Sequence, residues 1–533
     1  MDKSTGLLQQ LSEREDLREL RQSPMLLTAL CVKYDEGQRL PRDLYLLYHS
    51  LINQVLHSRY LDTTDLPAVR RRLAAIALGM HTGDAVRQPR ATPEPAVSYD
   101  EVERILADYA GVETASEGGA DLAAEKRDDL VTRSGLLLPR GEGHAAFYHF
   151  SFQEYLAAER LFALDTELAA NLRQYAATPE WRRSLLFLFC AVADQRPQAA
   201  LDAVRTVLLP ALTLTALRNN PHPAWLLLNC LEIAHARGWA LGAFEAPLRQ
   251  VCAQSLAPDF PPVARNTLWL SAGQLGFDRR PGVDVDADGL PEIDWCPVAA
   301  GRVALEDGAG TFDVPAFAIA RHPVTNAQFR AFMAAGDGYR DTRWWDPAWL
   351  EAGWVDPSAP RPGRWTEPNA PRETVSWCEA VAFCRWLDHR LRARGGIGTD
   401  RQLRLPTEWE WQQAATGGDQ RRDFPWAGAW DPAKLNSGER GTGRTTAVGL
   451  YPAGVAACGA LDLAGNVWEW CLNRYDDAAN RAAGPGATRV VRGGSWILVR
   501  YLCRAAFRYG LVPNGRLDDI GFRVCLSSAI MNG

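Results

Sequence analysis

Tryptophan is distributed so unevenly along this chain that its two halves must fold differently. Only 4 of the 19 tryptophans precede residue 290, and the other 15 lie between Trp295 and Trp496. The first half carries leucine and alanine at helical spacing, whereas the second is rich in glycine, proline and short segments. Large aromatic side chains can build a core where regular structure is sparse. The pattern predicts a multidomain chain, with an all-α first half and an α+β second half.

The length of 533 residues exceeds what one hydrophobic core supports, so we expect two or three domains. The polar Pro/Gly/Asp stretch from Asp278 to Pro291 is typical of a linker. We therefore expect a helical and winged-helix-like region at 1–165, a helical stack at 166–280, a linker at 281–292 and a final domain at 293–530.

Several local patterns predict helices in the first half. Leucines 7, 8, 11, 17 and 20 form a broken helical stripe. Ser23-Pro24 predicts the start of a helix over 25–34, and Pro41 opens a longer helix that ends near Tyr60. The spacing of Ser98 and Glu101 is that of a capping box.

A short hairpin is predicted where the apolar segments 135–138 and 145–150 flank a polar turn. Ser151 and Glu154 have capping-box spacing and predict a following helix over 152–162. Helices followed by a hairpin and another helix indicate a winged-helix-like unit, and residues 181–275 continue with further apolar helices.

Residues 20–31, with the core Ser23-Pro-Met-Leu-Leu-Thr-Ala-Leu-Cys31, and residues 147–158, Phe-Tyr-His-Phe-Ser-Phe-Gln-Glu-Tyr-Leu-Ala-Ala, resemble the post-ATPase helical and winged-helix region of NACHT-type signalling ATPases. The resemblance covers roughly residues 7–190 and implies that His149 would reach the phosphates of ADP if an ATPase core were present. The alternative is that His149 caps the hairpin without a ligand. None of the four lysines follows a glycine, so no P-loop is recognisable. We expect a NACHT-type ATPase module in the same or a neighbouring chain, and expect this chain to be the C-terminal part of such a protein.

Seven ordered motifs punctuate the second half. They are the stretches 321–329, 373–384, 404–411, 424–428, 463–470, 492–496 and 520–524, among them Leu463-Ala-Gly-Asn-Val-Trp-Glu-Trp470 and Arg492-Gly-Gly-Ser-Trp496. Helices are predicted over 326–333 and 377–391. Together these motifs resemble the formylglycine-generating-enzyme family, which implies a C-type-lectin-like α+β fold over about residues 293–526.

The enzymes of that family bind copper through a cysteine pair that follows the Gly-Gly-Ser-aromatic motif. Here Leu498 occupies the first position, and Cys503 aligns with the second or with a later structural cysteine. Thiolates are the ligands that Cu(I) requires. The related iron enzymes need three histidines, and only His322 and His389 lie in this domain. We therefore expect a chain that is not an enzyme and requires no cofactor. The alternative is a formylglycine-generating-type copper oxidase or a related metal enzyme.

Some family members bind calcium, and the matching oxygen ligands would be Asn436, Asn466 and Glu469. Calcium normally takes several carboxylates or carbonyls. Here the acidic loop is replaced by Gly438–Arg444. An equally weighted alternative is that the three side chains hydrogen-bond the loop backbone.

Residues 492–524 interleave framework motifs with apolar residues where asparagine and other polar residues are common in ordinary relatives. This pattern is similar to the variable proteins of diversity-generating retroelements and implies an exposed ligand-binding face on segment 497–519. The alternative is that Ile497, Leu498 and Val499 complete the core. The expected ligand-binding positions are Ile497, Leu498, Val499, Tyr501, Leu502, Phe507, Tyr509, Gly510, Leu511, Val512, Gly515, Leu517, Asp518 and Asp519.

The leading hypothesis is a recognition protein with an unidentified protein ligand at this face, acting as the sensor part of a NACHT-type signalling or defence protein. The net charge of −6 and the absence of a Lys/Arg-rich run argue against nucleic-acid binding. Charged residues interrupt the most apolar stretch, 225–244, so no membrane segment is expected. Eleven scattered cysteines without a Cys-x-x-Cys pair favour reduced thiols and a cytoplasmic location.

Overall fold

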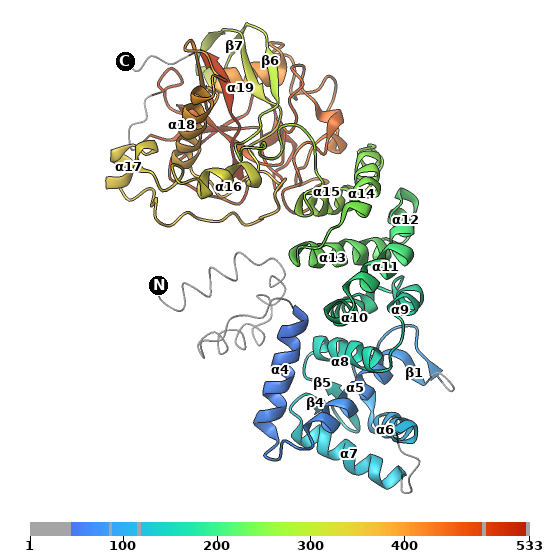
Figure 1. Cartoon of the computed structure of the whole chain (residues 1–533). Helices are drawn as coiled ribbons and strands as arrows, with labels where there is room; N and C mark the ends of the chain where they lie inside the picture. Colours follow the sequence, from blue (N-terminus) through green and yellow to red (C-terminus); the bar gives the residue numbers. More distant parts are fainter. Residues whose placement is uncertain (1–43, 85–87, 114–118, 482–486, 529–533) are drawn as a thin grey trace. The chain divides into compact units, whose positions relative to one another are not determined.

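The computed structural model describes residues 44–84, 88–113, 119–481 and 487–528 (Figure 1). The chain divides into two compact units, Met1–Trp239 and Ala240–Gly533. The leucine stripe of residues 7–20 and the helix expected over 25–34 lie outside the described residues. No helix in the described ranges is long and apolar enough to cross a bilayer.

The first unit is helical with one small sheet. Its long helices are α4 (Leu44–Arg59), α5 (Leu66–Thr82), α6 (Tyr99–Glu113), α7 (Gly119–Arg133) and α8 (Phe150–Ala163). The strands β3 (Val97–Ser98), β4 (Leu137–Pro139) and β5 (His144–Phe147) form an antiparallel sheet in the order β3-β5-β4. Strands β1 (Gly83–Asp84) and β2 (Gln88–Pro89) make a separate pair. The predicted hairpin and its following helix are therefore present.

The start of α8 differs from the prediction. His149, rather than Ser151, is the N-cap, and its side chain accepts a hydrogen bond from the Ser151 backbone N–H at 3.3 Å. The helix therefore begins earlier than the Ser151/Glu154 spacing predicts. Four aromatic rings then join α4, α8 and α10 (Arg182–Gln195) in the core: Tyr48, Phe152, Tyr155 and Phe187.

A run of helices completes this unit. They are α9 (Leu168–Tyr175), α10 (Arg182–Gln195), α11 (Pro197–Val207), α12 (Leu214–Asn219) and α13 (His222–Ala236), with the 3-10 turns η2 (Pro179–Trp181) and η3 (Leu209–Ala211).

The second unit begins about forty residues before the predicted linker. Its first helices are α14 (Gly242–Ser255) and α15 (Pro262–Gln274). Arg265 donates to the Leu450 carbonyl at 3.0 Å, and Asn266 accepts from the Ala447 N–H at 3.0 Å. Asn369 donates to the Trp269 carbonyl at 2.6 Å. These buried polar bonds make α15 part of the second unit, which corrects the expectation of a helical stack reaching residue 280.

The stretch 281–292 is not a free linker. Gln328 donates to the carbonyls of Gly282 and Glu292, at 3.1 and 2.6 Å. The Thr325 hydroxyl donates to the Val283 carbonyl at 2.7 Å. Because buried side chains satisfy its carbonyls, this polar segment packs against the domain instead of separating two domains.

Two four-stranded sheets form the frame of the second unit. One has the order β10-β15-β9-β6 and the other β13-β12-β11-β14, and a hairpin pairs β7 with β8. All pairs are antiparallel except β11 with β14. The strands are β6 (Trp295–Val298), β7 (Gly301–Ala304), β8 (Thr311–Val314), β9 (Phe317–Ala320), β10 (Arg401–Arg404), β11 (Trp468–Arg474), β12 (Arg489–Arg492), β13 (Arg508–Leu511), β14 (Ile520–Gly521) and β15 (Cys525–Ser528).

Three of the helices in this unit begin at capping boxes that can be read in the sequence: Thr325 with Gln328, Ser376 with Glu379, and Thr407 with Glu410. The two predicted helices are present, and α19 was not predicted. The helices are α16 (Asn326–Ala334), α17 (Pro347–Glu351), α18 (Trp377–Ala393) and α19 (Glu408–Thr416), with 3-10 turns η4 (Glu306–Gly308), η5 (Thr342–Trp344), η6 (Pro432–Lys434), η7 (Pro452–Gly454) and η8 (Arg500–Cys503).

Tryptophan fills the core of the second unit, as its distribution predicts. Of the 15 tryptophans after residue 290, all but Trp295, Trp354 and Trp430 are buried. Trp349 and Trp377 meet edge to face at 5.6 Å between α17 and α18. Aromatic packing therefore supplies much of the core between the helices and sheets of this domain.

Candidate functional site

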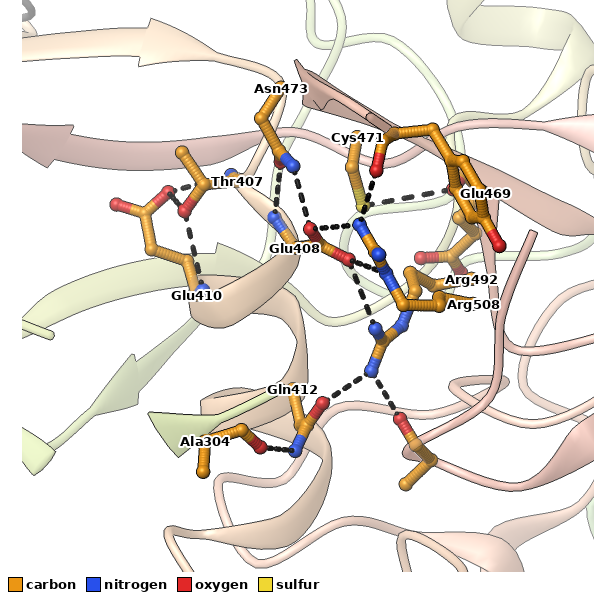
Figure 2. A network of polar contacts seen from close by, with 12 residues as sticks. Ala304, Thr407, Glu408, Glu410, Gln412, Glu469, Cys471, Asn473, Arg492 and Arg508 are labelled. Atoms are coloured by element: carbon orange, nitrogen blue, oxygen red, sulfur yellow. Dashed lines mark hydrogen bonds and ion pairs between the residues drawn. The ribbon is translucent and has the colours of Figure 1, made fainter. Parts of the chain in front are cut away.

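Segment 497–519 is tied to the domain by a buried carboxylate on the first turn of α19. Arg508 donates to the two carboxylate oxygens of Glu408 at 2.8 and 3.0 Å, and Asn473 donates to the same group at 2.8 Å (Figure 2). Arg492 forms an ion pair with Glu408 at 3.3 Å and also donates to Gln412. All of these side chains are buried or nearly so. The Arg508 side chain therefore anchors strand β13 to α19.

A second buried ion pair holds the far end of the segment. Arg516 donates to Glu379 at 2.8 Å, and Tyr339 donates to the other carboxylate oxygen at 2.7 Å. Burial alone would raise the pKa of Glu379, but the guanidinium of Arg516 and hydrogen bonds hold that pKa below its usual value. Glu379 therefore stays ionised inside the domain.

Asp519 also belongs to this anchoring. Its carboxylate accepts from the Ser495 hydroxyl at 2.7 Å, and its carbonyl accepts from the Trp468 N–H at 2.8 Å. Burial raises the pKa of Asp519. Asp519 was an expected ligand-binding position, but it is only 8% exposed because it takes part in this anchoring.

Six large apolar side chains of the segment are exposed between 50% and 58%. In the described part of the second unit, the other exposed large apolar residues are Val263 and Val455. We call the six side chains the exposed apolar face; they are Ile497, Val499, Tyr501, Tyr509, Val512 and Leu517.

The remaining expected positions are half-buried. Leu498, Leu502, Phe507 and Leu511 pack against the core. Of the three residues that the alternative assigned to the core, Leu498 packs there, whereas Ile497 and Val499 are exposed.

Three half-buried positions have backbone or polar constraints of their own. A Cβ at Gly510 would lie 2.7 Å from the Tyr475 ring, so this glycine is sterically required. Gly515 is also half-buried. Asp518 forms an ion pair with Arg364.

Aromatic rings pack around the two exposed tyrosines of the face. Phe507 lies edge to face with Tyr501 at 5.4 Å, and Trp468 is 6.1 Å from Phe507 and 6.2 Å from Tyr509. The Arg504 guanidinium lies 4.4 Å over the Tyr501 ring and pairs with Glu306 at 2.9 Å. The two exposed tyrosines therefore rest on a preformed aromatic base.

The three proposed calcium ligands are engaged with protein groups. The Asn436 amide donates to the Arg444 carbonyl and to the Asn466 side chain, at 2.8 and 3.1 Å. Glu469 is paired with Arg523 at 2.7 Å and accepts from the Trp411 indole. The Oδ1 atoms of Asn436 and Asn466 accept the backbone N–H groups of Thr442 and Thr446, as the alternative given above expects. Glu469 is instead engaged by two side chains.

The positions of the copper-binding pair offer no thiolate pair. Leu498 is half-buried against the cluster that contains Cys503. Cys503 is fully buried, and burial raises its pKa to about 12. In the described ranges, no three His, Cys, Asp or Glu side chains gather into a group that could hold a metal ion. The described residues therefore do not fit an iron or copper centre.

His149 lies at the N-terminus of α8 in the first unit. Its Nδ1 lies 2.5 Å from the Ser151 hydroxyl, and burial and then Arg183 lower its pKa. A neutral ring suits its role as acceptor for the Ser151 N–H.

Sequence reasoning missed the acidic anchors, Glu408, Glu379 and Glu306. The first two lie in motifs that were recognised, but nothing in one sequence pairs them with arginines 100 and 137 residues away. For Glu408 and Glu379, the feature of the sequence that could have indicated an anchor is an acidic residue inside a motif that also carries aromatic residues.

Comparison with known proteins agrees with this architecture. Residues 267–528 match the sulfatase-modifying factor enzyme 1-like domain, and residues 52–161 match the winged helix-turn-helix domain C-terminal to NACHT. The inactive C-alpha-formylglycine-generating enzyme 2 of Mus musculus is 30% identical over 266 residues, which are 42% of this chain and 79% of that protein. The chain belongs to the formylglycine-generating-enzyme family.

Other relatives carry different names. Hercynine oxygenase of Mycolicibacterium thermoresistibile is 37% identical over 251 residues, covering 41% of this chain and 52% of that protein. The chain matches between 52% and 61% of the length of three hercynine oxygenases. A solved structure, Treponema denticola variable protein 1, is 23% identical, covers 44% of this chain and 95% of that chain, and has a TM-score of 0.34.

These relatives correct two expectations. The prediction that the chain is not an enzyme is contradicted, because hercynine oxygenase and formylglycine-generating enzyme are enzymes, although one relative is named inactive. The prediction that no cofactor beyond an optional calcium is involved is contradicted as well, because oxygenases typically need iron or copper together with O2.

Proposed function

We propose that the second unit is a recognition domain that binds a protein ligand through the exposed apolar face. The carrying observation is the concentration of exposed apolar side chains. Six of the eight large ones in the described part of this unit fall within residues 497–517. Large exposed apolar side chains that are concentrated in one segment are typical of an interaction site. Tyr501 and Tyr509 are the residue type enriched among interface hot spots.

The way the segment is held supports exchange of its exposed side chains. Its polar ties run through Arg508, Arg516 and Asp519, together with main-chain atoms. None of these ties uses a side chain of the exposed apolar face. A retroelement-diversified surface needs this separation, because most variants would otherwise fail to fold.

The first unit would link recognition to signalling. Residues 52–161 match a winged-helix domain that follows NACHT modules. A NACHT-type ATPase in the same or a neighbouring chain is the partner this domain suits. Under this proposal, ligand binding at the exposed apolar face acts as the sensor input of a signalling or defence protein.

A phage-displayed library of random 12-residue peptides tests the recognition function. Panning against the full chain should enrich peptides whose binding is lost in a variant with Tyr501→Ser, Tyr509→Ser and Leu517→Ser. A matched control carries Val263→Ser and Val455→Ser, which alter exposed apolar residues elsewhere in the same unit, and should bind as the parent does. Failure to enrich any peptide, or equal binding by the triple variant, would reject the proposal.

A second candidate is an O2-dependent oxidation, favoured by the 37% identity to a hercynine oxygenase. The metal donors for such a reaction are not gathered among the described residues, so no step is derived for it. The test is to load the chain with Fe(II) or Cu(I), measure bound metal by mass spectrometry, and follow O2 uptake with hercynine. Stoichiometric metal and hercynine-dependent uptake would support this candidate, and the lack of both would reject it.

A further inference from the structure

A loop outside segment 497–519, at residues 438 and 439, hydrogen-bonds the backbone at the start of the segment. Glu439 accepts the Arg500 backbone N–H on Oε1 at 2.8 Å. The neighbouring Gly438 N–H donates to the Leu498 carbonyl at 2.8 Å. The two residues therefore hold Leu498 and Arg500 without contacting any variable side chain through these bonds.

The Glu439 carboxylate is itself fixed from the other side. Its Oε2 accepts from the Trp430 indole N–H at 3.1 Å. Trp430 in turn lies 5.0 Å from Phe424 and 6.3 Å from Trp426, between ring centroids. Both carboxylate oxygens are therefore used, one toward a packed aromatic cluster and one toward the segment.

The backbone at Gly438 lies very close to the backbone of residues 497 and 498. A Cβ at this position would lie 2.5 Å from the Ile497 carbonyl oxygen and 3.3 Å from that of Leu498. No real Cβ occupies such a distance from a backbone oxygen. A larger residue at 438 would push the segment away and break both hydrogen bonds.

The hydrogen bonds from Gly438 and Glu439 do not depend on the side chains that segment 497–519 exposes. Ile497 and Val499 flank the held carbonyl and are 56% and 54% exposed. Replacing them leaves the Gly438 and Glu439 bonds in place, because those bonds reach only main-chain atoms. Because main-chain atoms do not change with the identity of the side chain, such contacts keep the same backbone conformation when side chains are replaced.

From this geometry we infer that Glu439 is a positioning residue of the recognition face, which presets the backbone of residues 497–500 for ligand binding. The inference rests on the proposed function. Preorganised binding loops lose less conformational entropy when a partner docks. Loss of Glu439 is expected to weaken binding through this loop while the exposed apolar side chains remain unchanged.

Hydrogen–deuterium exchange on the full chain tests the inference without a ligand. Glu439→Ala should speed exchange in peptides covering 497–503 several-fold, because the lost hydrogen bond to the Arg500 N–H is solvent-exposed and contributes less than a buried one. Glu439→Gln should give an intermediate increase, because an amide has one acceptor oxygen for two N–H donors. The control, Glu351→Ala, removes an exposed carboxylate on α17 and should change nothing.

The library-selected peptides supply the functional readout. Glu439→Ala should lower their affinity while the melting temperature of the chain stays within a few degrees of the parent's. Unchanged exchange over 497–503, or faster exchange with unchanged affinity, would overturn the positioning role. If the parent enriches no peptide while exchange responds as expected, the proposed function fails and the role of Glu439 is reduced to holding the loop.

Discussion

Arg508 donates two hydrogen bonds, at 2.8 and 3.0 Å, to the carboxylate of Glu408, which precedes it by 100 residues. The pair connects β13 to α19, and the next residue of the strand, Tyr509, belongs to the exposed apolar face. Because neighbouring residues of a strand point to opposite sides, Arg508 can anchor the strand while Tyr509 faces solvent.

Removing the carboxylate at this anchor is expected to be severe. Glu408→Ala leaves the guanidinium groups of Arg492 and Arg508 buried without their shared partner, so the free energy of unfolding should fall by about 3–5 kcal/mol. Equilibrium denaturation monitored by tryptophan fluorescence measures this. Glu351→Ala, an exposed carboxylate, is the control, and a loss below about 1 kcal/mol for Glu408→Ala would show that the network is dispensable.

Exposed and buried apolar residues should differ clearly in their contribution to the free energy of unfolding. Tyr501→Ser, Tyr509→Ser and Leu517→Ser should each change the free energy of unfolding by less than about 0.5 kcal/mol, because these side chains are half exposed. Phe522→Ala, at a fully buried position, should cost about 3–5 kcal/mol. Comparable losses at all four positions would place the exposed apolar face in the core.

The ionisation of Asp462 should make the free energy of unfolding depend on pH. Burial raises the pKa of this aspartate to about 6. A raised carboxyl pKa means that the folded state holds its proton longer than the unfolded chain, so stability is lost as pH rises from about 4 through 6. The parent should therefore lose about 3 kcal/mol relative to Asp462→Asn over this range.

Asparagine is a suitable replacement at position 462, because the residue has φ +56° and asparagine tolerates that conformation. Denaturation curves of both proteins at pH 4, 5, 6 and 7 give the comparison. Parallel pH profiles would mean that Asp462 ionises in the fold as readily as in the unfolded chain.

His149 should behave as a helix cap. Its ring accepts the Ser151 N–H at the start of α8, so His149→Ala should lower the stability of the first unit by about 1 kcal/mol. His144→Ala, an exposed histidine on β5, serves as the matched control. Thermal unfolding of both variants decides the point, and equal melting temperatures would contradict the capping role.

The docking of α15 can be tested at a buried amide. Asn266→Ala leaves the buried N–H of Ala447 without an acceptor, which should cost about 1–3 kcal/mol. Thr267→Ala changes the next residue of the same helix, whose hydroxyl is exposed and bonds only its own helix. Denaturant unfolding of the second unit should therefore shift for Asn266→Ala and remain unchanged for Thr267→Ala.

Local features of the second unit could be predicted because their causes are local. A capping box is set by two residues three positions apart, so the starts of α16 and α18 are readable directly from Thr325 with Gln328 and from Ser376 with Glu379. The tryptophan distribution located the loop-rich domain, because its core has to come from large side chains. The ordered motifs gave the family, and the interleaved residues pointed to segment 497–519.

What only the tertiary structure decided is which of these residues face solvent and which hold the domain together. The sequence alone treats Asp518, Asp519 and Leu517 alike, yet Asp519 is bonded to Ser495, Asp518 is paired with Arg364, and Leu517 is exposed. The domain boundary at residue 240 likewise depends on bonds from Arg265 and Asn266 to loops about 180 residues further along the chain. Helix caps and periodicity are short-range and are present in the order of the residues. Exposure, ion pairing and docking depend on which distant residues the fold brings together, and that information exists only in three dimensions.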